Sequence, residues 1–129
     1  RLRVTSSGEY LLAFEPWHVD QIRRAEKTAT RREWNEDTTG PSPGTVVAAT
    51  TDLSVAARDV DCYVRVEAVY DQPLGEMTDA DARAEGYADL EEFRTAYCEV
   101  YGDAAWDDRK VVTVVEFEYV GRERPAEVS

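Results

Sequence analysis

Five positively charged residues lie within ten positions near the start of the chain, where only Glu26 opposes them. They are Arg23, Arg24, Lys27, Arg31 and Arg32. Lys27 is one of only two lysines in a chain of 129 residues that otherwise uses arginine. A desolvated lysine can lose its proton and activate a neighbouring hydroxyl, whereas an arginine stays charged. The hydroxyl of Thr30, three positions after Lys27, is therefore a candidate nucleophile.

This chemistry depends on how the chain is folded between Lys27 and Thr30. In a helical turn or a tight loop the two side chains would share a face, while in a regular strand they would point apart. A catalytic pair therefore requires a turn at 27–30. The alternative is structural: the cations would lie at a helix C-terminus, which suits the helix dipole, or form a solvated surface. Thr28 and Thr30 would then cap backbone groups.

The composition describes a folded, acidic protein. Apolar residues make up 43% of the chain and charged residues 33%, which suits one globular domain better than a disordered segment. The net charge of −12, with arginine in place of lysine, resembles the composition of proteins from halophilic archaea. An acidic surface also keeps a protein soluble at ordinary salt. Because broad adhesion to nucleic acid is not expected, contact with a polyanion should be local to the 23–32 window.

Residues with metal or redox chemistry are few. Cys62 and Cys98 are too few and too far apart for a metal knuckle or a disulfide framework. His18, the single histidine, has no cysteine or acidic cluster nearby, so we expect neither a metal nor a cofactor. No apolar run approaches the ~20 residues of a membrane helix, and no signal peptide is visible. We therefore expect a cytoplasmic protein with reduced thiols, whose oligomeric state the sequence leaves open.

Four apolar segments predict β-strands, and they lie at residues 9–14, 45–52, 62–70 and 111–120. In the third segment, every second residue from Cys62 to Tyr70 should form one buried face. Both faces of the last segment are apolar, which indicates a central strand in a closed or nearly closed sheet.

The first helix should begin at Pro16, because proline suits the first turn of a helix. Its inward face would consist of Val19, Ile22 and Ala25, which recur at three-residue spacing. Residues 33–44 are rich in proline, glycine and capping residues and predict a loop. Trp34 in this loop could stack on a base or anchor the loop to the core.

Two further helices are expected as an insert before the last strand. A capping box at Thr78–Asp81 begins the first, which Gly86 ends, and Asp89 begins the second, which Gly102 ends. The apolar stripe of the second helix is Leu90, Phe93, Tyr97 and Val100. A short turn around a packed Trp106 should follow. Strands that bracket these helices predict a small α+β domain on a mixed, barrel-like sheet.

Several of these segments together resemble the ASCH domain family. The resemblance covers about residues 10–120, and its most specific part is Lys27-Thr28-Ala29-Thr30-Arg31-Arg32. The segment Thr78–Phe93, which includes Ala84-Glu85-Gly86-Tyr87, is the second part, and Val114–Phe117 is the third. A glycine is common just before the lysine in such domains, whereas this chain has Ala25-Glu26. The resemblance implies a PUA-like β-barrel and a cleft between barrel and helices that is suited to RNA or a modified nucleobase.

The resemblance also implies a set of site residues. Some small members of the family remove the acetyl group from N4-acetylcytidine, and their lysine, threonine and glutamate correspond to Lys27, Thr30 and Glu85. Thr28, Arg31, Arg32 and Trp34 would bind the ligand, with an arginine on a phosphate or an oxyanion. In the structural alternative, Lys27 and Glu85 form an ion pair that closes the helix onto the barrel.

Three functions remain open from the sequence. The first is recognition of RNA or a modified nucleoside in the cleft, without catalysis. The second is amide hydrolysis on an acylated cytidine, with Thr30 as nucleophile, Lys27 as base and Glu85 as proton relay. The third is metal-independent cleavage of RNA, for which Lys27 and Glu85 are the only candidate base and acid.

Overall fold

The protein was analysed as a computed structural model, which describes residues 2–4, 10–32, 41–51 and 61–122. The strands are β1 (Leu2–Val4), β2 (Tyr10–Ala13), β3 (Ala29–Arg32), β4 (Val46–Thr50), β5 (Cys62–Pro73) and β6 (Val111–Gly121). The helices are α1 (Pro16–Arg23), α2 (Asp79–Ala84) and α3 (Leu90–Tyr101), with short 3₁₀ turns η2 (Leu74–Glu76) and η3 (Asp103–Ala105). The predicted strands, first helix and two-helix insert are thus all present.

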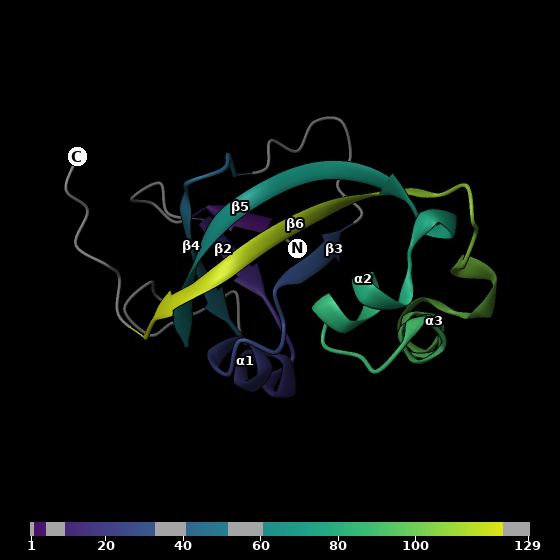
Figure 1. The fold of residues 1–129 in the computed structure, drawn as a ribbon, viewed down its shortest axis with the longest axis horizontal. Helices are drawn as coiled ribbons and strands as arrows, with labels where there is room; N and C mark the ends of the chain where they lie inside the picture. The colour runs from purple at the N-terminus through teal and green to yellow at the C-terminus, as the bar shows by residue number, and fades with distance from the viewer. Residues whose placement is uncertain (1, 5–9, 33–40, 52–60, 123–129) are drawn as a thin grey trace.

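The six strands form one sheet in the order β1-β2-β4-β5-β6-β3. Neighbouring strands are antiparallel except for β2 and β4, which are parallel, so the sheet is mixed. β5 and β6 are long, curved strands that cross the whole molecule, with β2 and β4 near one end and α2 and α3 near the other (Figure 1). This curled sheet with its helices confirms the predicted α+β, PUA-like class.

β6 is a central strand because apolar residues cover both of its faces. It pairs with β5 on one side and β3 on the other, and Val114 and Val115, which point to opposite faces, are both fully buried. On β5 a bulge between Val66 and Ala68 breaks the predicted alternation. Tyr70 was predicted to face the core, but beyond this bulge it is 38% exposed, so that part of the prediction is wrong.

α1 packs its apolar stripe against the main core of the sheet. Pro16 begins the helix as predicted, and Val19 and Ile22 are buried among the core residues. Ala25 was predicted to continue this face, but it is exposed because the helix ends at Arg23. The chain then turns through Ala25, whose φ of 61° lies in the left-handed region.

The two-helix insert has its own smaller core, formed by Leu74, Met77, Ala82, Phe93 and Val112. The predicted capping box of Thr78 and Asp81 is present, and Asp89 caps α3. Gly86 ends the α2 segment with a φ of 100°, as predicted. Trp106 packs on this core, but Val100 is 72% exposed, so the predicted stripe of α3 stops at Tyr97.

Candidate functional site

The turn that precedes the cation cluster lies earlier than the sequence predicted. The backbone N–H groups of Glu26 and Lys27 both donate to the carbonyl of Gln21, which closes the turn around Ala25. β3 then begins at Ala29, so Thr30 is a strand residue. The turn at 27–30 that a catalytic Lys27–Thr30 pair requires is therefore absent, because the chain has already reversed at the left-handed residue Ala25.

Lys27 is buried, with 3% of its surface exposed, and its ammonium group contacts Glu85 twice. Nζ donates to the Glu85 carbonyl at 2.7 Å and to the carboxylate Oε1 at 3.1 Å. Since Glu85 is the C-cap of α2, Lys27 supplies a cation to that helix end, where it suits the helix dipole. Burial lowers the pKa of Lys27, while the charge of Glu85 acts in the opposite direction.

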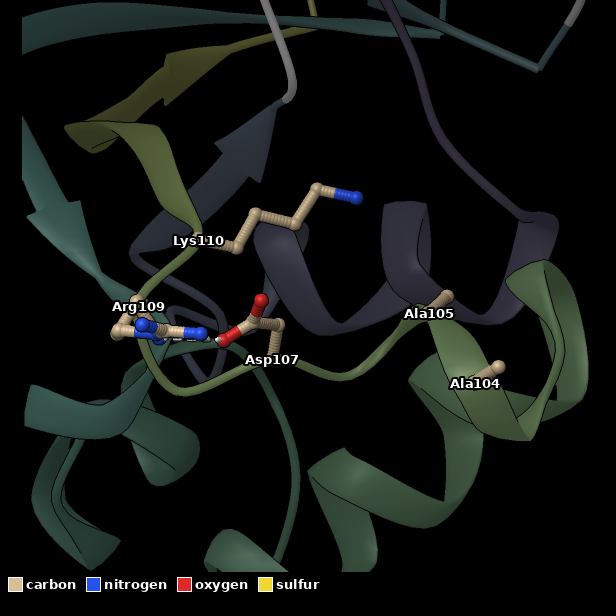
Figure 2. Close-up of a pocket in the computed structure, with 5 residues that line it drawn as sticks. All are labelled: Ala104, Ala105, Asp107, Arg109 and Lys110. Carbon is tan, nitrogen blue, oxygen red and sulfur yellow. Dashed lines mark hydrogen bonds and ion pairs between the residues drawn. The ribbon is translucent and has the colours of Figure 1, made fainter.

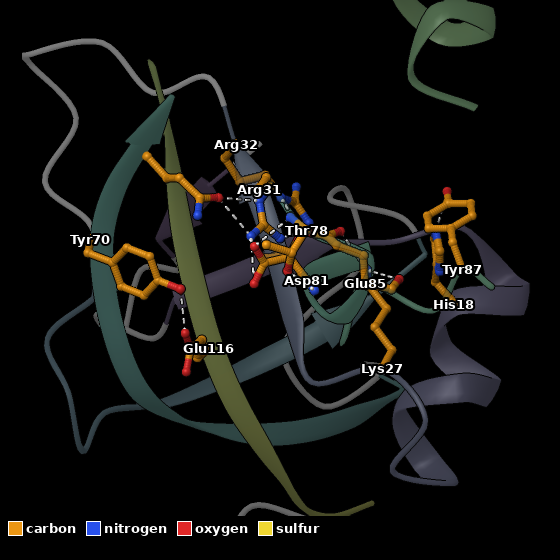
Figure 3. A network of polar contacts seen from close by, with 12 residues as sticks. His18, Lys27, Arg31, Arg32, Tyr70, Thr78, Asp81, Glu85, Tyr87 and Glu116 are labelled. Carbon is orange, nitrogen blue, oxygen red and sulfur yellow. Dashed lines mark hydrogen bonds and ion pairs between the residues drawn. The ribbon is translucent and has the colours of Figure 1, made fainter. Parts of the chain in front are cut away.

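Arg31 holds the second oxygen of the same carboxylate. Its Nη1 donates to Oε2 of Glu85 at 2.9 Å, and its Nε and Nη2 donate to Oε1 of Gln72. Its side chain is only 4% exposed, and the further carboxylate of Asp81 lies 3.8 Å away and is 29% exposed. Figure 3 shows how Glu85 at the end of α2 meets Lys27 and Arg31. The Lys27–Glu85 ion pair therefore does close the helix onto the sheet.

Arg32 connects two strands that are not neighbours in the sheet. From β3 its Nη2 donates to the carbonyl of Ala13 in β2 at 2.8 Å, and its Nε donates to Oγ1 of Thr30 at 3.1 Å. The guanidinium carbon lies 5.0 Å from the centroid of the Phe14 ring. Burial lowers the pKa of Arg32, and the nearby Glu85 and Tyr101 oppose this shift. The residue nevertheless remains partly exposed to solvent.

The predicted site residues are only partly brought together. Thr30 is 5% exposed and accepts from Arg32, and no hydrogen bond joins it to Lys27 in the described structure. The side chain of Thr28 is exposed, while its backbone joins α2 to β6 through bonds to Ala84 and Phe117. Trp34 lies outside the described residues.

The predicted solvated arginine surface is correct for one end of the window only. Arg24 is 59% exposed and pairs with Glu26, and Arg23 lies in the last turn of α1. The side chains of Lys27 and Arg31 are almost fully buried. The window thus divides at Ala25 into a surface part and a buried part.

His18 and Gln21 also belong to this region, although no pattern in the sequence indicated their part in it. His18 Nδ1 contacts Gln21 at 2.8 Å and Nε2 contacts the Tyr87 hydroxyl at 3.2 Å, while Nε2 of Gln21 donates to the Gly86 carbonyl. These bonds attach α1 to the segment that follows Glu85. Burial, with repulsion from Lys27, lowers the pKa of His18 to about 4, so the ring is neutral at pH 7.

A separate open hollow of about 640 Å³ lies between η3 and the start of β6 and is lined by Ala104, Ala105, Asp107, Arg109 and Lys110 (Figure 2). Two of its charged groups, Asp107 and Arg109, already pair at 3.8 Å. It contains none of the predicted site residues.

The described residues contain no group of three or more His, Cys, Asp or Glu side chains that could hold a metal ion. In the same residues, no helix combines the length and the apolar character that crossing a membrane would require.

The sequence matches no family model and no curated protein, but solved structures share its fold. An ASCH domain from Lactobacillus crispatus is similar over 86% of this chain and 79% of its own, with a TM-score of 0.71 and 15% identity. A protein from Enterococcus faecalis covers 88% of this chain and 76% of its own, at TM-score 0.61 and 16% identity.

The ASCH protein from Zymomonas mobilis is similar over 84% of this chain and 68% of its own length, with a TM-score of 0.59 and 12% identity. At such low identities the likeness concerns the fold alone. The chain therefore has the ASCH fold, a curled mixed sheet with one helix between its early strands and two before the last.

Proposed function

We propose that the region around Arg32 binds RNA or a modified nucleoside, with a phosphate or another anionic group of the ligand on this guanidinium. Arg32 is partly exposed, and among the described residues it is the member of this cation group that pairs with no carboxylate, whereas Lys27 and Arg31 both pair with Glu85. A guanidinium is well suited to a phosphate because its planar set of N–H groups can donate two parallel hydrogen bonds.

A charge imbalance carries this proposal. Lys27, Arg31 and Arg32 gather around one buried carboxylate, that of Glu85, which already contacts Lys27 and Arg31. Within the described part of the chain Arg32 forms no ion pair, and its two hydrogen bonds use neutral acceptors. Keeping a partly buried charge without a counter-charge is costly, and an anionic ligand would remove that cost.

The test is binding of a fluorescently labelled single-stranded RNA by anisotropy, with Arg32→Gln compared with Arg24→Gln. Loss of a charged hydrogen bond should weaken binding of Arg32→Gln about 10- to 150-fold. Arg24→Gln removes the same charge from the same window, but from an exposed side chain, so it should change binding less than about 3-fold.

Thermal unfolding of both variants is the control for folding, because Arg32 also bonds the Ala13 carbonyl. Equal losses of affinity in the two variants would mean that only the net charge matters. The affinity should also fall only slightly as salt rises, since one local cluster neutralises few phosphates. A steep dependence on salt would point to a larger basic surface than the Arg32 region.

We further propose amide hydrolysis as a second function, on the ground that burial lowers the pKa of Lys27 beside Glu85. In that reaction Oγ1 of Thr30 attacks the acetyl carbon and its proton passes to Nζ of Lys27. The carbon–nitrogen bond then breaks, Glu85 relays the proton to the leaving amine, and water releases acetate from Thr30. Lys27 and Thr30 would have to approach each other, because each now bonds another residue.

Incubation of the protein with N4-acetylcytidine in high salt, beside Thr30→Ala, tests this second function. Release of cytidine by the unsubstituted protein alone would support it and identify the nucleophile. Full activity of Thr30→Ala would exclude Thr30 from that role, and no turnover by either protein would leave binding as the function. Electrophoresis of the RNA after the binding assay tests the third function, since intact RNA would exclude cleavage.

A further inference from the structure

Five aromatic rings form a continuous row from the start of α1 to the end of α3. Trp17 meets Tyr87 at a centroid distance of 5.6 Å, and Tyr87 meets Phe93 at 5.4 Å. Phe93 then meets Tyr97 at 6.3 Å, and Tyr97 meets Tyr101 at 4.7 Å. The middle of this aromatic row, Phe93, is buried in the core of the helical insert.

Both ends of the aromatic row are open to solvent. Trp17 is 47% exposed and Tyr101 is 57% exposed, although large aromatic side chains usually contribute more when they are buried. Trp17 also stacks on His18, with ring centroids 3.7 Å apart and planes inclined by 30°. This stack and the contact with Tyr87 fix the orientation of the Trp17 ring, so its exposed face is preorganised for a ligand.

The aromatic row runs beside the buried cations. At one end, His18 bonds Tyr87, and Figure 3 shows both rings close to Lys27 and Glu85. At the other end, Tyr101 lies near enough to Arg32 to influence the pKa of its guanidinium. The aromatic row, with its two exposed ends, therefore accompanies a cluster of cations in which Arg32 forms no ion pair with any described residue.

The charges around the aromatic row indicate where the phosphates and where the bases of a ligand would lie. Glu85, Glu92, Glu15 and Glu99 are near enough to Tyr87 to add to the effect of burial, and together these raise the pKa of its hydroxyl to about 12. Because these carboxylates repel anions, the phosphates of a ligand should lie at Arg32 and away from the aromatic row. Uncharged bases can lie on the rings. Stacking on aromatic side chains is how proteins hold the unpaired bases of single strands.

We propose that Trp17 and Tyr101 each stack one base of a single-stranded RNA whose backbone phosphate lies on Arg32. This rests on the proposed function and narrows it, because two separate stacking positions select a strand of at least two nucleotides over a free nucleoside. The three rings between Trp17 and Tyr101 in the row place these two positions apart, so one base cannot occupy both.

The experiment measures the affinity for a labelled oligouridylate of about ten nucleotides, and uses unlabelled oligouridylate and free uridine as competitors. Trp17→Ala and Tyr101→Ala should each weaken binding about 5- to 150-fold, the range for loss of one stacked base. Trp17→Phe and Tyr101→Phe keep an aromatic face and should recover most of the affinity. Val100→Ala is the matched control, since Val100 is the neighbour of Tyr101 and is 72% exposed.

A second readout is the tryptophan fluorescence of the complex. RNA should change the emission of the unsubstituted protein, and Trp17→Phe should lose most of this change even where it still binds. Free uridine should compete poorly because it fills only one position. Competition by uridine as strong as by the oligonucleotide would overturn the two-base proposal.

Other outcomes separate this proposal from the one on which it rests. If Arg32→Gln loses RNA binding while the alanine variants at 17 and 101 retain it, the anion site stands and the stacking positions are wrong. If the unsubstituted protein binds no RNA, both proposals fail. Sedimentation would detect a second copy of the chain on these rings, and a dimer that Trp17→Ala dissociates would also overturn the stacking proposal.

Discussion

The cations before and after Ala25 in the 23–32 window lie in opposite environments, one exposed and the other buried. Arg24 lies beyond the end of α1, is 59% exposed and pairs with Glu26, which is 54% exposed. Lys27, only three positions later, is 2% exposed at its side chain and pairs with Glu85, which is 5% exposed. Both pairs have the same nitrogen–oxygen distance of 3.1 Å, so distance alone does not distinguish them.

What differs is how much water surrounds each pair. Exposed charges are screened and gain little from pairing, usually ~0–1 kcal/mol. Buried charges have lost their hydration, so removing one partner leaves the other charge buried with neither water nor a counter-charge to stabilise it. Neighbouring cations in a sequence can therefore differ greatly in their contribution to stability, because that contribution depends on the burial of each side chain.

Removing the carboxylate of each pair should give the largest contrast. Glu85→Ala leaves Lys27 without its counter-charge and Arg31 with only the more distant Asp81, so it should lower the free energy of unfolding by about 3–5 kcal/mol. Glu26→Ala, the matched change at the surface pair, should lower it by less than about 1 kcal/mol. Urea unfolding followed by circular dichroism measures both values.

Glu85→Gln, which keeps one carbonyl oxygen as an acceptor, should be less harmful than the alanine variant. Similar small losses for Glu85→Ala and Glu26→Ala would break the comparison, because they would mean that the Lys27–Glu85 pair is hydrated in solution.

The stability of the protein should depend on pH through His18, whose ring lies close to the buried Lys27. Its pKa is lowered from 6.5 to about 4 by burial and by Lys27, so between these values the unfolded chain binds a proton that the folded chain does not. Stability should therefore fall as the pH is lowered from 6.5 to 4. With allowance for the partial exposure of the ring, the loss should be about 2 kcal/mol.

His18→Phe keeps a ring against Trp17 but cannot titrate, so it separates this effect from the titration of carboxylates. Unfolding at pH 7 and pH 4 should show a larger loss for the unsubstituted protein than for the variant. Equal losses would show that His18 is charged and hydrated in the folded protein.

The smallest expected effect concerns Ala25, the residue that divides the window. A left-handed φ of 61° strains an alanine, whereas glycine adopts it freely. Ala25→Gly should raise the free energy of unfolding by about 0.5 kcal/mol, because relief of strain exceeds the added freedom of the unfolded chain. Ala80→Gly in α2, where the backbone is helical, should instead lower it by about 0.5–1 kcal/mol.

Much of the fold could be predicted because its signals are local. The capping box at Thr78, the glycine stop at Gly86 and the apolar residues on both faces of β6 depend on residues close in sequence, and all three are present. The predictions were wrong where contacts with residues distant in the sequence override a local pattern. Tyr70 was misplaced because a bulge in β5 shifts its alternation, and this bulge becomes evident only in the register of β5 with β6.

The sequence indicated which residues lie in the candidate site better than it indicated how they are arranged. Lys27, Arg31, Arg32 and Glu85 were identified by residue type and by resemblance, and the structure places them together. The turn at 27–30 that the catalytic pair requires is not formed, because the chain reverses at Ala25, whose left-handed conformation could not be predicted from the sequence. Gln72 and the aromatic row were missed, since side chains from several elements form them and no spacing in the sequence connects them.

Local patterns in the sequence predicted the helices and four of the strands, but they did not predict β1 or β3. The acidic character of the chain and the concentration of cations at 23–32 also follow from the sequence alone. The fold determines which of these cations are buried, which carboxylate neutralises Lys27 and Arg31, and that Arg32 forms no ion pair within the described residues. The physical reason is that burial and pairing depend on contacts between residues that are 54 and 58 positions apart, as in the bonds of Glu85 with Arg31 and Lys27. Hydrophobic periodicity is a property of neighbours, whereas the electrostatics of a buried charge is a property of everything that surrounds it.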